Sequence, residues 1–266
     1  MLLTFLKYEN IKFIKSFQFI APIFLYLIWV VGIYIYTDIP ILSSYGSTSV
    51  GLYIISTWLT ITNFKTDSIN ERYVFYIQLS SKLKYLIFKM TYIFLIVFTL
   101  NIISLFYPIL LGNFDKSMTL NLFFIGLIIH ILMGGFGILL GTYITNTNII
   151  FKPYWWLITV FFIIVSLIKI IIVNNLPFTN WILWILPPIN NLLSYLTEDS
   201  IQIYDLNFLV LVLISFAYQF IAFCPLIYLY KKNTRMKIAH RSLKQVIDGL
   251  FSCLINFIKL SLNLTI

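Results

Sequence analysis

Charged residues, cysteines and alanines are scarce in this chain. Only 10% of its 266 residues are charged and 61% are hydrophobic, whereas a soluble domain usually carries about 25% charged residues. This balance excludes a water-soluble fold, because such a fold could not bury so much apolar surface. The two cysteines, Cys224 in an apolar run and Cys253 near the C-terminus, argue against a disulfide framework or a thiolate metal site. Scarce alanine beside frequent Ile, Asn, Tyr and Lys is compatible with an AT-rich bacterial genome.

The apolar residues form runs long enough to cross a bilayer, which needs about 20 apolar residues per helix. Six runs predict six transmembrane helices, at residues 17–36, 49–64, 88–112, 120–144, 154–173 and 206–230. The second run is the shortest and could begin as early as Ile41, since Gly46 and Gly51 loosen its start. No small-residue cleavage site follows the first run, so we expect no cleaved signal peptide. The predicted fold class is an all-α polytopic membrane protein that begins with a basic amphipathic helix over residues 1–16.

The positive charges sort to one side of these six spans. With the N-terminus in the cytoplasm, the cytoplasmic segments hold all of the 18 Lys and Arg residues except Lys116 and Lys169. The predicted outer loops carry Asp38, Asp115 and three further acidic residues. This bias predicts that both termini are cytoplasmic, and the net charge of +9 then needs no nucleic-acid partner. Lys169 lies near the outer end of the fifth span, where its stem can stay in lipid while its ammonium reaches the interface.

The segment after the second span predicts a short cytoplasmic helix. Ser68 is followed three residues later by Glu71, which matches a capping box at a helix start. Apolar residues then recur at helical spacing, which makes the helix two-faced. We interpret it as a coupling helix with contact residues Ile69, Tyr73, Tyr76 and Ile77. Read alone, the segment is also compatible with an ordinary basic entry into the third span.

The outer segment 174–205 is apolar but too short to cross the membrane twice. Pro187 and Pro188 must interrupt a helix, so we expect a re-entrant hairpin of two short helices at the outer interface. Trp181 and Trp184 are interpreted as interface anchors rather than a ligand cage, because tryptophan is enriched at membrane surfaces.

The C-terminal segment 233–266 forms a separate basic tail after the membrane domain, residues 1–232. Its apolar residues, among them Ile247, Leu250 and Leu254, alternate with polar ones every three or four positions. That pattern favours an amphipathic helix on the membrane or on a partner. A seventh span over residues 246–266 stays open.

The spans contain few groups capable of chemistry. His130 is the one ionisable residue near the middle of a span, and we expect it to be neutral and hydrogen-bonded rather than a metal ligand or proton relay. No paired-histidine protease motif is present, and the glycine-rich fourth span lacks the lysine of a phosphate-binding loop. We therefore predict no catalytic residue, no metal and no directly bound cofactor. Gly134, Gly137 and Gly141 are expected to serve helix packing or dimer formation.

The order of these elements resembles an ABC type-2 transporter permease. The local match is best at residues 67–72, DSINER, and 79–89, LSSKLKYLIFK, where an acidic helix start is followed by a leucine, small residues and basic residues before the third span. The glycine-rich fourth span and the Pro187-Pro188 pair also lie where that family has corresponding features. The resemblance covers residues 2–232. The chain departs from the family in lacking a glycine after the acidic residue and a proline before the small and basic residues.

The resemblance implies a transport subunit of the bacterial plasma membrane. A second permease chain, identical or paralogous, would pair with it, and a cytoplasmic ABC ATPase subunit would carry the ATP and Mg²⁺. The family implies outward transport of an amphipathic peptide, as in bacteriocin immunity or toxin secretion, or of a lipid-like substrate. The competing hypothesis is a membrane scaffold, assembly factor or peptide sensor without an ATPase. An enzyme ranks third and would depend on His130.

Overall fold

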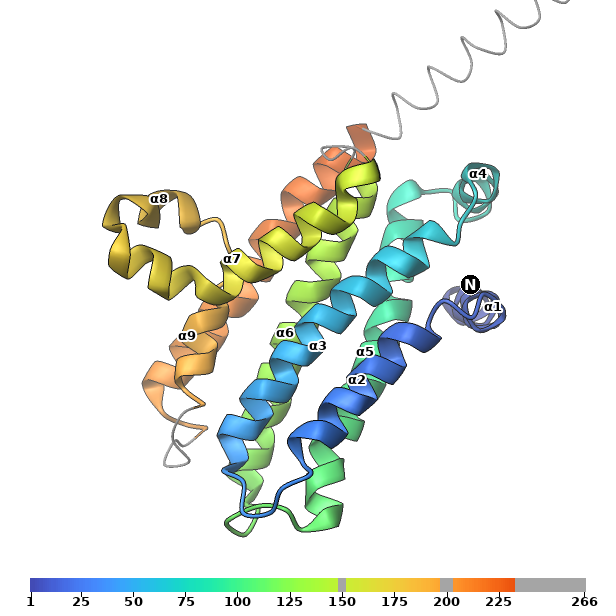
Figure 1. Ribbon diagram of the computed structural model, residues 1–266. Helices are drawn as coiled ribbons and strands as arrows, with labels where there is room; N and C mark the ends of the chain where they lie inside the picture. Colours follow the sequence, from blue (N-terminus) through green and yellow to red (C-terminus); the bar gives the residue numbers. More distant parts are fainter. Residues whose placement is uncertain (148–151, 197–202, 233–266) are drawn as a thin grey trace, which may run out of the picture.

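The computed structural model describes residues 1–147, 152–196 and 203–232, and every regular element in these ranges is helical (Figure 1). The predicted tail lies outside the described residues. We call the last helix, Leu206–Lys232, the final helix. The remaining elements are α1 (Leu2–Lys15), α2 (Ile20–Ile33), α3 (Ile41–Lys65), α4 (Ile69–Gln78), α5 (Lys82–Leu111), α6 (Leu120–Asn146), η1 (Lys152–Tyr154), α7 (Trp155–Asn175), η2 (Pro177–Thr179), α8 (Asn180–Leu183) and α9 (Ile189–Ser194).

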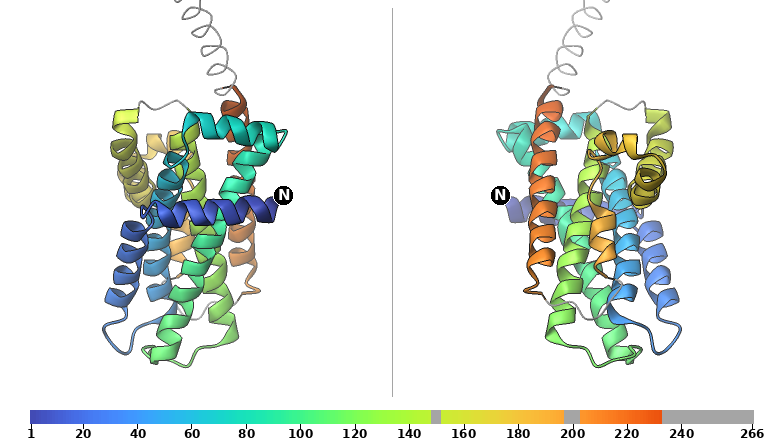
Figure 2. Two further views of the ribbon diagram at one scale, coloured as in Figure 1. Left: turned by 90° about the vertical axis from the view of Figure 1, so that its right-hand side faces the viewer. Right: turned by 90° about the vertical axis from the view of Figure 1, so that its left-hand side faces the viewer.

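The bundle is built around α3 and α6, which run side by side through its centre (Figures 1 and 2). Helices α2 and α5 pack on this pair, and α1 lies across the bundle axis against α5 (Figure 2). The final helix and α7 lie at the periphery, with only 17% of their apolar windows buried, compared with 67% for α6. The peripheral helices therefore present most of their apolar side chains to the surroundings.

Close approach of α3 and α6 depends on glycines of α6. A Cβ atom placed on Gly137 would lie 1.9 Å from the hydroxyl of Ser56, and one on Gly141 would lie 2.8 Å from the carbonyl oxygen of Thr57. A Cβ on Gly134 would instead lie 2.7 Å from Val97 of α5. In this structure all three glycines serve packing within the chain, while a role in dimer formation stays a prediction.

Among the described residues, four helices are long and apolar enough to cross a membrane, which makes the chain a membrane protein. They are α5, α6, α7 and the final helix; the pair of α1 and α2 counts as a fifth candidate if its two parts, bent by 84°, are taken as one span. Helix α2 begins at Ile20 and has only 14 residues, or about 21 Å, so it is shorter than the predicted run 17–36. The bend lies at Phe17, whose backbone is left-handed with φ of 55°. Six spans are thus not established.

Helix α3 is 25 residues long but less apolar than the four candidate spans. Its many hydroxyl residues are buried against neighbouring helices and bond back to the helix backbone, as Ser56 and Thr57 do to the carbonyl oxygen of Tyr53 at 3.0 and 2.8 Å. A central helix can hold such residues, because its neighbours shield it from lipid and its hydroxyls are satisfied. The helix begins at Ile41, the earlier of the two starts that the sequence allows.

Two connections, between α2 and α3 and between α5 and α6, meet at one end of the bundle (Figure 1). The backbone N–H of Ile39 donates to Asn113 at 3.1 Å, and that of Asp115 donates to Ile39 at 3.2 Å. Asn113 also donates from its side chain to the carbonyl oxygen of Tyr34 at 2.6 Å. These contacts tie together the two loops that the charge pattern assigns to the outer side.

The segment after α7 forms two short helices, α8 and α9, on either side of Pro187 and Pro188. Trp181 and Trp184 belong to α8 and its C-terminal cap and are 78% and 81% exposed. Helix α8 lies beside α7, well away from the end of the bundle where the two connections meet (Figures 1 and 2). This arrangement gives no support to an outer position of the tryptophans, which stays a prediction.

Candidate functional site

The short helix α4 begins where the capping pattern predicts. Ser68 is its N-cap, and the hydroxyl of Ser68 accepts a hydrogen bond from the backbone N–H of Glu71 at 3.2 Å. The Glu71 carboxylate, in contrast, is directed to α1, where it accepts hydrogen bonds from the Tyr8 hydroxyl at 2.7 Å and from Lys12. Glu71 therefore connects two helices in addition to its place in the first turn of α4.

The inner face of α4 is held by aromatic contacts. Phe75 packs against Phe5 and Tyr8 of α1, with ring centroids 5.2 and 5.3 Å apart. The hydroxyl of Tyr76 lies 2.7 Å from that of Tyr230 in the final helix. The ring of Tyr76 also packs edge-on against Tyr85 of α5, with centroids 5.3 Å apart, so this side chain points inward and is only partly exposed. Its expected role as a coupling contact stays a prediction.

The outer face of α4 carries exposed apolar side chains. Ile69 is 57% exposed and Ile77 is 79% exposed. Val74, at 51%, belongs to the same face and was not predicted. Tyr73 is partly exposed and packs edge-on against Tyr76. The exposed or partly exposed side chains of this face are therefore Ile69, Tyr73, Val74 and Ile77, and their contact with a partner stays a prediction.

Beneath α4, Asp67 is the centre of a buried ion network. Its carboxylate is fully buried and pairs with Lys12 of α1 and with Lys89 of α5. The hydroxyl of Tyr85 donates to the same carboxylate. Asp67 lies in the connection between α3 and α4, so the network joins α1, α5 and this connection.

Glu9 completes the network from α1. Its side chain and that of Lys89 are both fully buried, with Nζ of Lys89 3.4 Å from Oε2 of Glu9. This distance is longer than that of a charge-assisted hydrogen bond, and neither oxygen of Glu9 has a hydrogen-bond partner among the described residues. Glu9 thus contributes charge at close range without a well-formed hydrogen bond.

The two carboxyl groups respond differently to this environment. Burial raises the pKa of Glu9, and the positive charge of Lys89 opposes this shift without cancelling it. Burial also disfavours the ionised form of Asp67, but the charge of Lys89 and the hydrogen bonds from Lys12, Lys89 and Tyr85 outweigh it, so the pKa of Asp67 lies below its ordinary value of 3.8. Asp67 is therefore the carboxylate that the network holds in its charged form.

A groove of about 480 Å³ separates α1 from α4 on the surface above the network. Thr4 and Tyr8 line it from α1, and Val74 and Gln78 line it from α4. Because Val74 belongs to both the groove and the outer face of α4, the two form one continuous surface. The geometry provides an exposed, partly apolar surface, and among the described residues no group of His, Cys, Asp and Glu side chains could hold a metal ion.

His130 lies away from this site, in the middle of α6. Its Nδ1 is 2.8 Å from the carbonyl oxygen of Gly126 and its Nε2 is 3.0 Å from the hydroxyl of Thr48. Both ring nitrogens thus have partners, which agrees with the hydrogen-bonded histidine expected from the sequence. Its contacts tie α6 to α3.

The sequence reasoning missed Glu9, Asp67 and Lys89 as a unit. One signal was present, since Glu9 lies four residues after Phe5 and four before Phe13, in the middle of the buried face of α1. A carboxylate in an apolar stripe implies a buried cationic partner. The sequence did not indicate that Lys89 would be that partner.

Comparison of the chain with protein-family models, with curated proteins and with solved structures found no match. The function must therefore be inferred from the residues themselves and from the geometry of α1, α4 and the ion network.

Proposed function

We propose that the chain is the membrane-spanning permease subunit of an ATP-driven ABC exporter in the bacterial plasma membrane. In this proposal the chain crosses the membrane six times, with α7 and the short helices after it forming one crossing, and both termini are cytoplasmic. The charge bias across the connections and the family resemblance of residues 67–84 support this arrangement.

One observation carries the proposal: α4 combines an exposed apolar face with a firm attachment to the bundle. Ile77, Val74 and Ile69 point outward, while Asp67, Arg72 and Tyr76 bind the helix and its connection inward. Arg72 donates to the carbonyl oxygen of Phe64 at the end of α3. A movement imposed on α4 by a partner would therefore reach α3 and α5 instead of being absorbed by a loose loop.

The proposed partners follow from the separate ATPase and permease subunits of such a transporter. A separate cytoplasmic ATPase subunit binds α4 and α1 and carries the ATP and Mg²⁺, and a second permease chain completes the pathway. The proposed substrate is an amphipathic peptide or a lipid-like molecule, since such a substrate can use a pathway with few polar groups. The peripheral helices, with most side chains exposed, suit lateral contact with it.

The test is purification of the tagged chain from its native host in mild detergent, with the co-purifying proteins identified by mass spectrometry. We expect a stoichiometric nucleotide-binding subunit. The variant Ile77→Asp should lose this subunit yet insert normally, because a carboxylate disrupts the apolar contact. Leu120→Asp is the matched control: Leu120 is equally exposed, at 78%, but starts α6 near the opposite end of the bundle.

Repeated isolation of the intact chain without a nucleotide-binding subunit would refute the transporter. The scaffold or sensor hypothesis would then replace it, with α4 as the contact for a different protein. Equal loss of the subunit in both variants would place the contact elsewhere than on α4.

A further inference from the structure

Helix α1 turns away from the direction in which the other long helices run. It is joined to α2 through a bend of 84°, and it lies across the bundle axis against α5 (Figure 2). Because α5 is a candidate span, a helix that lies across it runs nearly parallel to the membrane plane. Helix α1 therefore has one side directed along α5 toward the bilayer and another side directed away from it.

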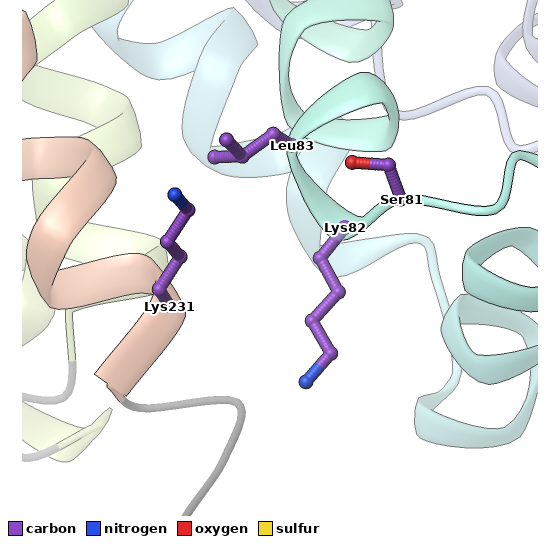
Figure 3. A pocket seen from close by; sticks show the side chains of 4 residues that line it. All are labelled: Ser81, Lys82, Leu83 and Lys231. Carbon is purple, nitrogen blue, oxygen red and sulfur yellow. The ribbon is translucent and has the colours of Figure 1, made fainter.

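The level of the membrane surface follows from the length of α5. Its 30 residues span about 45 Å, whereas the hydrocarbon core is about 30 Å thick and needs about 20 residues. Figure 3 shows the lysine-rich end of the bundle, where Lys82 of α5 and Lys231 of the final helix border one cavity of about 320 Å³. Counting about 20 residues back from Leu111 places the start of the hydrocarbon core near Tyr92. The ring of Tyr92 packs against Phe13 of α1 with centroids 6.1 Å apart, so α1 lies where the hydrocarbon core begins.

The contacts of α1 show which of its sides is directed toward the membrane. Tyr8 is directed to α4, with its hydroxyl bonded to a carboxylate of that helix at 2.7 Å. Asn10, on the opposite side, accepts a hydrogen bond from the hydroxyl of Tyr92 at 3.3 Å. Leu3 lies two helical turns before Asn10 and Ile14 one turn after it, so both belong to the side of Asn10. This side therefore looks along α5 toward the bilayer.

The membrane-directed side of α1 is apolar and exposed. Leu3 is 80% exposed, Ile14 is 49% exposed, and Phe17 at the bend is 69% exposed. Lys7 and Lys15 follow these apolar residues, are exposed, and form no ion pair with another described residue. A lysine beside an apolar strip can keep its stem on lipid while its ammonium reaches the headgroups. Such a combination is typical of a helix that lies in a membrane interface.

We propose that α1 lies in the headgroup region of the leaflet at the lysine-rich end of the bundle, with Leu3 and Ile14 directed into the acyl chains. On the other side of the helix, Lys12 pairs with Asp67 and Glu71, so the lipid contact fixes the height of α4 above this leaflet. The proposal does not rest on the ATPase contact, because the groove between α1 and α4 uses a different side of α1.

The test is site-directed spin labelling of the full chain in liposomes of phosphatidylcholine and phosphatidylglycerol, after replacement of Cys224 and Cys253 by serine. Leu3→Cys and Ile14→Cys carry the nitroxide in two separate proteins, and Thr4→Cys is the matched control. Thr4 is exposed like Leu3 and lies next to it in the chain, but it lines the groove toward α4. Because all three side chains are exposed, the label disturbs no closely packed contact.

The nitroxide reports its surroundings through two relaxing agents, oxygen, which concentrates in lipid, and a nickel chelate, which stays in water. We expect the ratio of the oxygen effect to the nickel effect to be several-fold higher at Leu3 and Ile14 than at Thr4. A ratio at Leu3 and Ile14 no higher than at Thr4, with nickel dominant, would overturn the proposal, because this side would then lie in water. Dominance of oxygen at all three positions would also overturn it, because α1 would then enter the bilayer as part of a broken span. Neither result depends on an ATPase, so the proposed function is tested separately.

Discussion

Replacing Asp67 by asparagine tests whether the ion network holds α1, α4 and α5 together. The side chain keeps its size and can still accept the hydrogen bond from Tyr85, but Lys12 and Lys89 lose their shared carboxylate. Removing one partner of a buried ion pair typically costs about 3 to 5 kcal/mol, because the other charge stays buried. Glu9 remains 3.4 Å from Lys89, so we expect a loss near the lower end, about 3 kcal/mol.

The loss is measured as the free energy of unfolding of the purified chain in detergent, by urea or dodecyl sulfate titration followed by tryptophan fluorescence. Asp115→Asn is the matched control. Asp115 is a partly exposed carboxylate 4.0 Å from Lys116, which is 64% exposed, so its loss should cost less than about 1 kcal/mol. If Asp67→Asn costs no more than Asp115→Asn, the network does not hold the helices together.

The stability difference between the wild type and Asp67→Asn should also depend on pH. Because the pKa of Asp67 is lower in the folded chain than its ordinary value of 3.8, folding favours the ionised form. Its contribution is present above pH 3.8 and is lost as the pH falls through the lower folded value. The stability difference between the wild type and Asp67→Asn should therefore shrink on acidification, and a difference that grows would contradict the assigned direction.

Two further predictions concern packing and topology. Gly137→Ala should destabilise the chain by about 1 to 3 kcal/mol, because the added Cβ would overlap Ser56. The control Gly32→Ala should be neutral or slightly stabilising, because its Cβ would meet nothing within 4 Å. Equal melting temperatures of the two variants would exclude a tight contact between α3 and α6. In a background without Cys224 and Cys253, an impermeant thiol reagent added to intact cells should label Lys116→Cys but not Lys82→Cys, and the reverse pattern would invert the proposed topology.

Much of the fold follows from local patterns. Long apolar runs predict α5, α6, α7 and the final helix, because an apolar helix surface is stable in lipid whichever helices lie beside it. The cap Ser68 and the residues after it predict α4, because capping acts within one turn. The break at Pro187 and Pro188 is equally local, since proline cannot continue a helix there.

The sequence by itself determined that this is a helical membrane protein with a capped, two-faced helix between two of its apolar segments. Only the tertiary structure decided that α3 lies at the centre despite its hydroxyl residues, that Tyr76 points inward, and that Glu9 and Asp67 share Lys89. Such features depend on residues distant in the chain, and a charge in an apolar stripe shows that a partner is needed without showing which one. The local sequence determines where the helices begin and end, and contacts across the bundle determine which helix faces stay exposed.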